Sequence, residues 1–391
     1  MKNIAYVCAD AGIPVFGTKG ASIHVQSIVR ALIKQGHRVT LFASRFDGPV
    51  PPGLDTVCCV PLPAIPKGMA EERAMACLRS NDDTCRLLDA HGPFDLVYER
   101  YSLWSDAGMR WADAQGVPGL LEVNAPLIDE QRTHRTLVMP EKAEEIARSV
   151  FNLATALLPV SPAVGAYLEG WTGDSSRIHV IANGVDPDRF AHCATDRAQQ
   201  GLEGRTCVVG FVGTLKPWHG LPLLVDAFAL LHRQRPEARL LVVGDGPCRT
   251  EIEESLAQRK LSDYCHFSGA VQADDVPDLL TQMDIATAPY PSQQDFYFSP
   301  LKIYEYLAAE LPVVTTRVGH LDSVVMDGVD GMLVAPDDPQ ALADALMQLV
   351  DDPARRRQMG HAGRERIIAG HSWDAVVERF LSIADQAKKQ H

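Results

Sequence analysis

Long apolar runs are missing from this sequence. No run of about 18 apolar residues occurs, so no transmembrane helix is expected. The N-terminus, MKNIAYVCAD, leads straight into a strand-like run and has neither the long apolar core nor the small-residue cleavage site of a signal peptide. These absences predict a cytoplasmic protein whose contact with a membrane is at most peripheral.

The sequence also lacks cysteines at the spacing of a metal or redox motif, and it has no excess of basic over acidic residues. The nine cysteines include no pair with CxxC spacing, and no cluster of His and Cys resembles a zinc site. Reduced thiols are therefore expected, as in the cytosol, and we expect no bound metal. The formal net charge of −13 argues against a nucleic-acid partner.

Basic side chains nevertheless gather in two stretches, 67–86 and 132–148, where acidic residues interrupt them. One interpretation is a solvated helix face, and the other is contact with an anionic or lipid-linked acceptor. The basic residues are Lys67, Arg73, Arg79 and Arg86 in the first stretch, and Arg132, His134, Arg135, Lys142 and Arg148 in the second.

Short apolar runs alternate with longer helix-period segments, twice over, along the 391 residues. The runs are rich in Val, Ile and Leu, which is typical of strands buried on both faces of a parallel sheet. We therefore predict an α/β protein of two Rossmann-like, doubly wound domains. The expected strands are 3–9, 38–43, 56–62, 95–98, 120–123, 156–160 and 179–181, then 207–211, 239–243, 266–268, 285–288, 313–316 and 331–334.

The domain boundaries follow from this alternation. We expect an N-terminal domain over 1–187 and a C-terminal domain over 188–372, with the polar stretch 188–205 as a linker. A tail helix over 373–391 has no strand after it and is expected to pack back on the first domain. Ligands of open α/β sheets bind beyond the carboxyl ends of the strands, so two domains facing each other predict a cleft between them.

The segment SPLKIYEYLAAEL, residues 299–311, predicts an anion site at a helix start. Ser299 suits the N-cap and Pro300 the first helical position, which leaves the N–H groups of Leu301 and Lys302 free. A cation in the first turn opposes the helix dipole unless an anion shares the site. The alternative is an ion pair between Lys302 and Glu305. Glu305 can also accept hydrogen bonds from the two hydroxyls of a ribose.

The segment FVGTLKPWHG, residues 211–220, is similar. A strand ends at Gly213, the following loop contains Lys216 and His219, and a helix starts near Pro222. A diphosphate leaving group gains negative charge as the sugar–oxygen bond breaks, and fixed cationic donors stabilise that transition state. The alternatives are a packing role for Trp218 and a capping role for His219.

Glycine loops give a weaker signal. The residues CADAGIPVFGTKGASIH do not form GxGxxG, although a loop with Gly17 and Gly20 lets the backbone approach a phosphate or sugar. A flexible turn is the alternative. The run GDGPCR at 244–249 lacks a third glycine, so we expect no nicotinamide site there.

Taken together, these stretches resemble glycosyltransferase family 4, of the GT-B fold, over nearly the whole chain. The resemblance implies that the second domain holds a nucleotide sugar and the first mainly the acceptor, and that transfer retains the anomeric configuration. The matching pieces are the loop with Gly17 and Gly20, VIANGVDPDRF at 180–190, FVGTLKPWHG, LLVVGDGP, HFSGAV with DDVPDLL, DIATAPYPS, SPLKIYEYLAAELPVVTT, GMLVAPDD and the ending from MGHAGRERI to HSW.

The resemblance also assigns roles to individual residues. It implies that Glu305 binds the donor ribose and that the backbone of Pro300, Leu301 and Lys302 meets the phosphates and the sugar. It places Gly17 near the diphosphate. It implies nucleobase contacts for the strand-end segment formed by Gly269, Ala270 and Val271.

The sequence departs from the family pattern in the donor loop. Thr214 and His219 stand where the family usually has Arg and Lys, and we expect Lys216 to supply the missing cation. Tyr297 stands at the first of two glutamates that the family separates by seven residues, and Asp295 is the nearest carboxylate. The first glutamate normally touches the donor sugar, so the identity of that sugar stays open.

The first domain offers candidate acceptor and catalytic residues. Asn124 replaces a histidine often found at a strand end in the family; it can hydrogen-bond a sugar hydroxyl but cannot act as a base near neutral pH. Glu99, Arg100 and Glu122 also lie at strand ends, and Asp10 follows the first strand. Acceptor binding is one interpretation of these residues, and a buried ion pair of Glu99 with Arg100 is the other.

We therefore expect a retaining, metal-independent hexosyltransferase, without a cofactor, that uses a UDP- or GDP-sugar. Its acceptor would be a hydroxyl of a small molecule, glycan or lipid-linked compound, in polysaccharide or natural-product biosynthesis. Lys216, His219 and helix N-termini would stabilise the leaving diphosphate, with Asn124 as a further catalytic residue. The alternatives are a non-catalytic nucleotide-sugar-binding subunit and a GT-B nucleotide-sugar epimerase.

Overall fold

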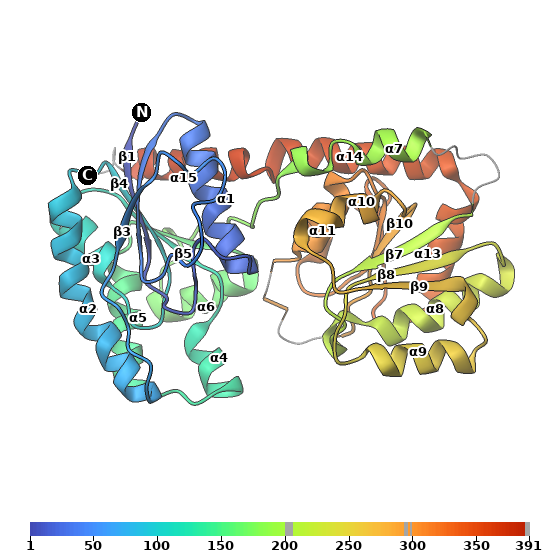
Figure 1. The fold of residues 1–391 in the computed structure, drawn as a ribbon, viewed down its shortest axis with the longest axis horizontal. Coiled ribbons are helices and arrows are strands. Elements are labelled where there is room, and N and C mark those ends of the chain that lie inside the picture. Colours follow the sequence, from blue (N-terminus) through green and yellow to red (C-terminus); the bar gives the residue numbers. More distant parts are fainter. Residues whose placement is uncertain (200–205, 293–295, 298, 388–391) are drawn as a thin grey trace. The chain divides into compact units, whose positions relative to one another are not determined.

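A computed structural model describes residues 1–199, 206–292, 296–297 and 299–387 of the chain. The chain divides into two compact units (Figure 1). The first contains residues 1–183, 297–299 and 373–391, and the second contains residues 184–296 and 300–372. Each unit is built on one six-stranded sheet, and the expectation of two doubly wound α/β units is confirmed.

The first sheet has the strand order β3-β2-β1-β4-β5-β6, and its paired strands are all parallel. The chain therefore starts in the middle of the sheet, builds one edge and then returns to build the other. The strands are β1 (Asn3–Cys8), β2 (Arg38–Ala43), β3 (Cys58–Pro61), β4 (Leu96–Arg100), β5 (Gly119–Val123) and β6 (Ala156–Pro159).

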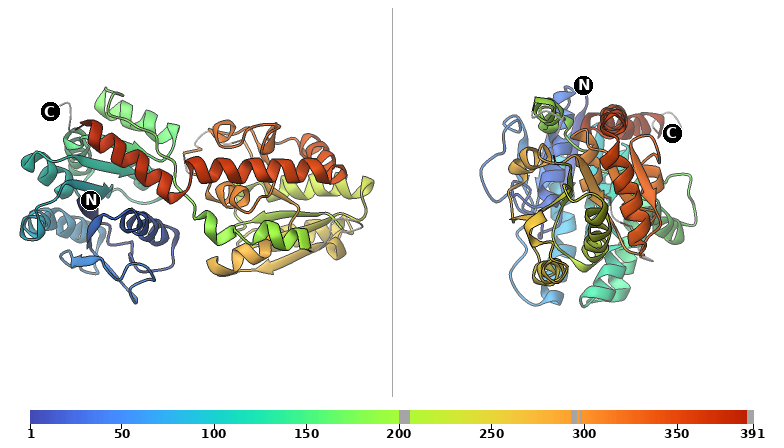
Figure 2. Two further views of the ribbon diagram at one scale, coloured as in Figure 1. Left: turned by 90° about the horizontal axis from the view of Figure 1, so that it is seen from above. Right: turned by 90° about the vertical axis from the view of Figure 1, so that its right-hand side faces the viewer.

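Helices cover both faces of this sheet (Figure 2). Alternate residues of β1 enter opposite cores, as the period of two requires: Tyr6 packs with one and Val7 with the other. The helices are α1 (Gly20–Lys34) and α15 (Trp373–Ala387) in the first core, α2 (Ala70–His91), α3 (Ala107–Gln115), α5 (Pro140–Leu153) and α6 (Pro162–Thr172) in the second, and α4 (Leu127–His134) beyond β5.

The second sheet repeats the same plan with the order β12-β11-β10-β7-β8-β9, again with parallel pairs. Its strands are β7 (Val208–Val212), β8 (Arg239–Val243), β9 (Cys265–Gly269), β10 (Ile285–Ala288), β11 (Val313–Thr316) and β12 (Gly331–Val334). Its helices are α7 (Cys193–Gln199), α8 (Leu221–Gln234), α9 (Arg249–Gln258), α10 (Val276–Leu280), α11 (Leu301–Ala308), α12 (Leu321–Val324), α13 (Pro339–Asp351) and α14 (Pro353–Gly370).

Two expectations about local structure are wrong. Residues 179–181, which the structure describes, form no strand, because this segment makes only a few backbone bonds beside β6, such as Ile181 N–H to the Pro159 carbonyl. Within residues 188–205, expected as a linker, a short helical turn and α7 pack into the second unit, with Phe190 and Cys193 buried. Residues 200–205 lie outside the described residues.

None of the helices in the described ranges combines the length and the apolar character needed to cross a bilayer.

Candidate active site

The strand order of each sheet marks where a ligand binds. In the first unit the chain reverses direction between β1 and β4, and in the second between β7 and β10. Parallel α/β sheets bind ligands at such switch points, beyond the carboxyl ends of the strands. The loops after β7 and β10, and those after β1 and β4, are therefore the places to look for chemistry.

The loop after β7 is held against its neighbour by two glycines. Gly213 has a φ of +147° and donates its N–H to the Val243 carbonyl at 2.9 Å. A Cβ on Gly244 would lie 2.1 Å from the Gly213 carbonyl oxygen, so only glycine fits there. The glycines of the GDGP run therefore have a packing role, and they fix the position of the loop that contains Lys216 and His219.

The helix after β10 begins one residue later than expected. α11 starts at Leu301, with Pro300 and not Ser299 as its N-cap residue. Proline fixes φ but not ψ, and the ψ of 67° at Pro300 lies outside the helical region. Ser299 therefore does not cap the helix, and its buried hydroxyl has no hydrogen-bond partner in the described part of the chain.

Lys302, in the first turn of α11, places a buried ammonium at the end of β7. Its Nζ makes no hydrogen bond within the described residues and lies 4.2 Å from the centre of the Phe211 ring. A Cβ on Gly213 would lie 2.8 Å from this Nζ, so the glycine makes room for the ammonium. Burial lowers the pKa of Lys302 to about 7, although Glu305 acts in the opposite direction.

His219 is close enough to Lys302 for the charge of the lysine to affect its pKa. Its Nδ1 lies 2.5 Å from the Thr214 carbonyl oxygen, and since a carbonyl only accepts, Nδ1 carries the proton. Burial first, then the charges of Lys302 and Lys216, lower the pKa of His219 to about 4. The ring is therefore neutral at pH 7, and an anion at its Nε2 would favour a second proton.

His219 and Lys302 share two aromatic neighbours. The His219 ring centre lies 6.1 Å from that of Phe211 and 6.2 Å from that of Tyr290, and the Lys302 Nζ lies 5.6 Å from the Tyr290 ring centre. α8 starts two residues after His219, with Gly220 as its N-cap residue. The starts of α8 and α11 therefore approach each other, and His219 does not cap α8.

Glu305 lies one turn beyond Lys302 on α11. Burial raises the pKa of its half-buried carboxyl, against the charges of Arg189 and Lys302. The Lys302 Nζ makes no hydrogen bond to it, so the expected alternative of a tight Lys302–Glu305 pair is not realised. The carboxylate is available to accept hydrogen bonds from hydroxyl groups.

The end of β9 completes this edge of the second sheet. Gly269 has a φ of +73°, and its carbonyl accepts the Gly244 N–H at 3.1 Å. Ala270 is exposed and Val271 half-buried. Lys216, whose Nζ lies 5.5 Å from the ring centre of the half-exposed Trp218, belongs to the loop after β7 at the same edge.

The first unit has a buried charged network at the ends of β4 and β5. Glu122 accepts hydrogen bonds from His24 Nε2 at 2.9 Å, Tyr98 Oη at 2.5 Å and Arg100 Nη1 at 2.7 Å, and also from Asn124 Nδ2. Burial would raise the pKa of Glu122, but His24, Arg100 and Tyr98 hold it well below its ordinary value. The network is therefore internally satisfied.

Glu99 is separate from that network. It accepts hydrogen bonds from Ser105 Oγ at 2.7 Å and from the Met109 N–H at 3.1 Å, and burial raises its pKa to about 7. The expected pair of Glu99 with Arg100 is wrong, because successive side chains of a strand point to opposite faces. Arg100 pairs with Glu122 instead.

The loop after β1 contains the remaining predicted glycines. The Gly17 N–H donates to the Pro14 carbonyl at 2.8 Å, and the Gly17 carbonyl accepts Gln26 Nε2 at 2.9 Å. The loop is therefore fixed at Gly17. Gly20 is exposed and is the first residue of α1, whose start has no side-chain cap.

A pocket of about 430 Å³ lies in the first unit, between the loops after β1 and β4. Asp10 lines it, and its Oδ1 accepts the Gly12 N–H at 2.7 Å. Other polar groups come from separate segments: Arg73 from α2, Ser102 from the loop after β4, Gln131 from α4, and Arg135 and Thr136 from the residues after α4. Asp10 is thus a predicted acceptor residue that lines a pocket of ligand size, whereas Glu122 lines only a cavity of about 10 Å³.

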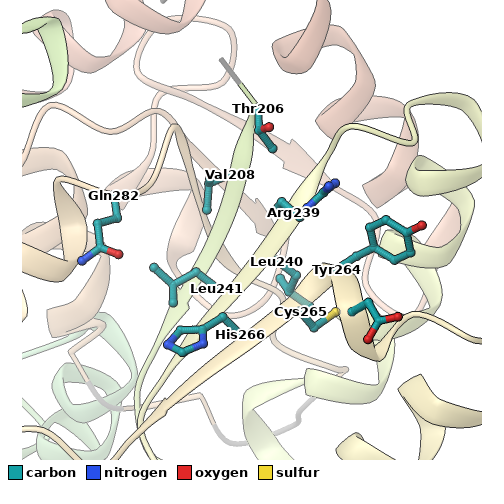
Figure 3. A pocket seen from close by; sticks show the side chains of 10 residues that line it. Thr206, Val208, Arg239, Leu240, Leu241, Tyr264, Cys265, His266 and Gln282 are labelled. Atoms are coloured by element: carbon teal, nitrogen blue, oxygen red, sulfur yellow. The ribbon is translucent and has the colours of Figure 1, made fainter. Parts of the chain in front are cut away.

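Another pocket, of about 510 Å³, lies at the wrong end of the second sheet for a donor (Figure 3). Val208, Arg239 and Cys265, which line it, are the first residues of β7, β8 and β9. The switch-point rule places ligands at the opposite edge. Among the described residues, no three His, Cys, Asp or Glu side chains gather closely enough to hold a metal ion.

Two family profiles match the chain. One, described as Glycosyltransferase Family 4, covers residues 18–189, and the other, described as Glycosyl transferases group 1, covers residues 206–352. The chain belongs to glycosyltransferase family 4.

This family 4 glycosyltransferase is similar to curated enzymes and solved structures along nearly its whole length. D-inositol 3-phosphate glycosyltransferase from Salinispora tropica is 26% identical over 95% of this chain and 82% of its own. A D-inositol 3-phosphate glycosyltransferase from Catenulispora acidiphila is 28% identical over 93% and 90%.

Solved structures show the GT-B fold of the family 4 enzyme. Sucrose-phosphate synthase from Thermosynechococcus elongatus matches with a TM-score of 0.72 at 23% identity and covers 100% of both chains. HepE from Anabaena, solved in complex with UDP, matches with a TM-score of 0.70 at 19% identity, over 98% of this chain and 100% of its own.

Sequence reasoning missed His24 and Trp104 in this glycosyltransferase. His24 lies on the buried face of α1, and a histidine on an apolar helix face was the available signal. Its partner Glu122 is 98 positions away along the chain, so no local pattern joins them. Trp104 lines the pocket with Asp10, and nothing local in the sequence distinguishes it from a core aromatic.

Proposed function

We propose that this glycosyltransferase transfers a hexose-type sugar from a UDP- or GDP-sugar to a hydroxyl group, with retention and without a metal ion. The observation that carries the proposal is the buried ammonium of Lys302, unpaired among the described residues, beside His219 at the switch point of the second sheet. A dianionic diphosphate is the partner that two converging helix starts and these side chains suit. UDP in the HepE complexes supports a nucleotide donor.

The reaction needs stabilisation of a leaving group. The bond between the sugar C1 and the β-phosphate oxygen breaks, and its electron pair goes to that oxygen. Lys302, Lys216 and the free N–H groups at the start of α11 would stabilise the developing charge. The acceptor oxygen would attack C1 from the same face, and its proton would pass to the departing phosphate.

Donor binding would bring protons to the site. Lys302 has a pKa of about 7 and His219 a pKa of about 4 in the free protein. A nearby diphosphate favours the charged form of both groups and raises both pKa values. Both side chains would then act as cationic donors. They would compensate for the loss of the Arg and Lys that the family usually has where this chain has Thr214 and His219.

The remainder of the donor site follows from the edge of the second sheet. We place the ribose at Glu305, the nucleobase at Gly269, Ala270 and Val271, and the phosphates at Pro300–Lys302. The half-buried carboxylate of Glu305 supports hydroxyl binding. All nine cysteines are free thiols, which supports action in the reducing cytoplasm.

A panel of nucleotide sugars tests the proposal. UDP- and GDP-hexoses are incubated with the full chain, binding is scored by thermal shift, and slow hydrolysis by product detection in EDTA. We expect at least one donor to bind and to release nucleoside diphosphate at an undiminished rate in EDTA. Loss of turnover that magnesium restores would contradict the metal-free mechanism, and an inverted anomer by NMR would contradict retention. The absence of any donor turnover would overturn transfer itself.

A further inference from the structure

The pocket beside Asp10 lies where the first sheet is built to bind a ligand. Ala9–Gly12 follow β1 directly and Ser102–Trp104 follow β4, the two strands at the switch point. Its volume of about 430 Å³ falls in the range of small-molecule sites, about 300–1,000 Å³. Position and size therefore indicate a ligand the size of a substituted monosaccharide.

Two arginines set the charge of this pocket. Arg73 and Arg135 line it from separate segments, and within the described residues neither has a carboxylate partner. Two arginines of the same basic stretches that lie outside the pocket are paired, Arg86 with Asp83 and Arg132 with Glu144 at 2.6 Å. The pocket is thus locally positive in a chain whose net charge is −13.

Asp10 adds one acceptor group. One of its oxygens takes the Gly12 N–H, which leaves the other to accept from a hydroxyl. Asp10 raises and Arg73 lowers the pKa of the Cys77 thiol, which burial raises most, so both charges lie near one wall of the pocket. Trp104, half-buried, offers an apolar face alongside Leu103 and Leu127.

The combination selects a particular chemistry. Neutral sugars are satisfied by carboxylates and amides, whereas two guanidinium groups from different segments match the three oxygens of a phosphate. A phosphomonoester carries a charge of about −1.5 to −2 at pH 7, which balances two arginines. A carboxylate at Asp10 would repel a bare phosphate, but it suits the hydroxyls of a polyol that carries one.

We propose that this pocket holds the acceptor of the reaction and that the acceptor is a phosphorylated polyol. Arg73 and Arg135 bind its phosphate, and Asp10 accepts from one of its hydroxyls. This inference rests on the proposed function. The same chemistry comes from a free polyol phosphate or from the head group of a lipid.

Direct binding to the full chain tests the pocket without any turnover. The probes are myo-inositol 1-phosphate and glucose 6-phosphate, with myo-inositol and glucose as unphosphorylated counterparts, each titrated by calorimetry. We expect a phosphorylated probe to bind at least tenfold more tightly than its neutral counterpart. Vesicles of phosphatidylinositol against phosphatidylcholine then show whether a lipid-borne head group is preferred over the free compound. Equal affinity for neutral and phosphorylated probes, or no binding of phosphorylated polyols in either form, overturns the proposal.

Matched variants locate the contact. We expect Arg73→Ala and Arg135→Ala each to weaken binding of the phosphorylated probe at least tenfold, and Asp10→Asn to weaken it less. Arg79→Ala, which removes an exposed arginine of α2 that does not line the pocket, should change nothing. Unchanged binding in Arg73→Ala together with Arg135→Ala would overturn the assignment, as would an equal loss in Arg79→Ala.

Donor hydrolysis without acceptor separates this inference from the proposed function. The control variant Arg79→Ala should hydrolyse the donor at the wild-type rate, because Lys302 and His219 are intact and Arg79 does not line the pocket. If the Arg73 and Arg135 variants hydrolyse the donor normally and also bind the phosphorylated probe normally, only the acceptor assignment is contradicted. A wild-type chain that binds the phosphorylated probe but turns over no donor sinks the proposed function and leaves the pocket in place.

Discussion

Two buried charges at strand ends of the two units are treated in opposite ways. In the first unit, Glu122 is 3% exposed and accepts hydrogen bonds from four side chains. In the second, the Lys302 ammonium is buried with no hydrogen-bond acceptor in the described part of the chain. A buried charge without a partner is costly, so it is expected where a ligand supplies the partner. We therefore expect the satisfied charge to stabilise the fold and the unsatisfied one to bind a ligand.

Removing the satisfied charge should have the largest effect, and on stability. We expect Glu122→Ala to lower the free energy of unfolding by about 3–5 kcal/mol, since it leaves Arg100 buried without its partner. Urea denaturation followed by circular dichroism measures the change. Asp351→Ala, which breaks the exposed pair with Arg235, is the control and should leave the midpoint unchanged. A urea midpoint equal to that of the wild type in Glu122→Ala would show that this buried charge does not stabilise the fold, and the contrast with Lys302 would be lost.

Removing the unsatisfied charge should affect catalysis and not stability. We expect Lys302→Met to lower the transfer rate by about 10²–10³-fold, as loss of one fixed donor to a developing anion does. Methionine fills the same apolar surroundings without a buried charge, so Tm should stay the same or rise. Lys67→Met, at an exposed lysine of the first unit, is the control. A large fall in Tm with normal activity per folded molecule would show that Lys302, like Glu122, stabilises the fold and does not take part in catalysis.

The neighbouring groups should have smaller effects in the same direction. We expect His219→Ala and Lys216→Ala each to lower transfer by at least tenfold with an unchanged unfolding transition, because each removes one donor while Lys302 persists. Initial rates at saturating donor, with Tm measured in parallel, test both. His361→Ala replaces an exposed histidine of α14 and should behave as wild type. Full turnover in the first two variants would remove them from the mechanism.

The contrast also explains what the sequence could predict. Five strands, β2, β8, β10, β11 and β12, begin and end at the predicted residues, because apolar runs between polar boundaries define them locally. Lys302 and His219 could be proposed as site residues from the sequence because each lies beside a helix start, which is a short-range pattern. Glu122 was found as a strand-end carboxylate, but its partners were not. The bond to His24 depends on how α1 packs over β5, and no local rule gives that packing.

Two wrong predictions about single residues, the N-cap of α11 and the partner of Arg100, also have specific physical causes. Ser299 has the composition of an N-cap, but the ψ of Pro300 decides the helix start, and composition does not fix it. Glu99 and Arg100 look like a pair in the sequence, although the alternation of a strand already separates them. The pocket beside Asp10 draws on α2, α4 and two loops, so its arginines became distinguishable from solvated ones only in the folded chain.

The smallest expected effect is a change of UDP affinity with pH, which depends on the charge of Lys302. The pKa of Lys302 is about 7 in the free protein, below the ordinary 10.5, so the cation is present below pH 7 and lost above it. UDP affinity, measured by calorimetry, should therefore fall by up to about tenfold per unit as the pH rises from 7 to 9. His219, with a pKa of about 4, stays neutral in the free protein over this range. Lys302→Arg keeps its charge and should flatten the profile.

The same titration leaves the Glu122 network of the first unit unchanged, so it distinguishes the two buried charges. The pKa of Glu122 lies well below its ordinary value, so this carboxylate is fully ionised from pH 7 to 9 and its network does not change. Glu99 of the first unit, with a pKa of about 7, does titrate at the lower end of that range, so the difference between the wild type and Lys302→Arg is what reports Lys302. A flat wild-type profile, or an equal slope in Lys302→Arg, would mean that another group governs the affinity and that the unpaired ammonium is not held for the diphosphate.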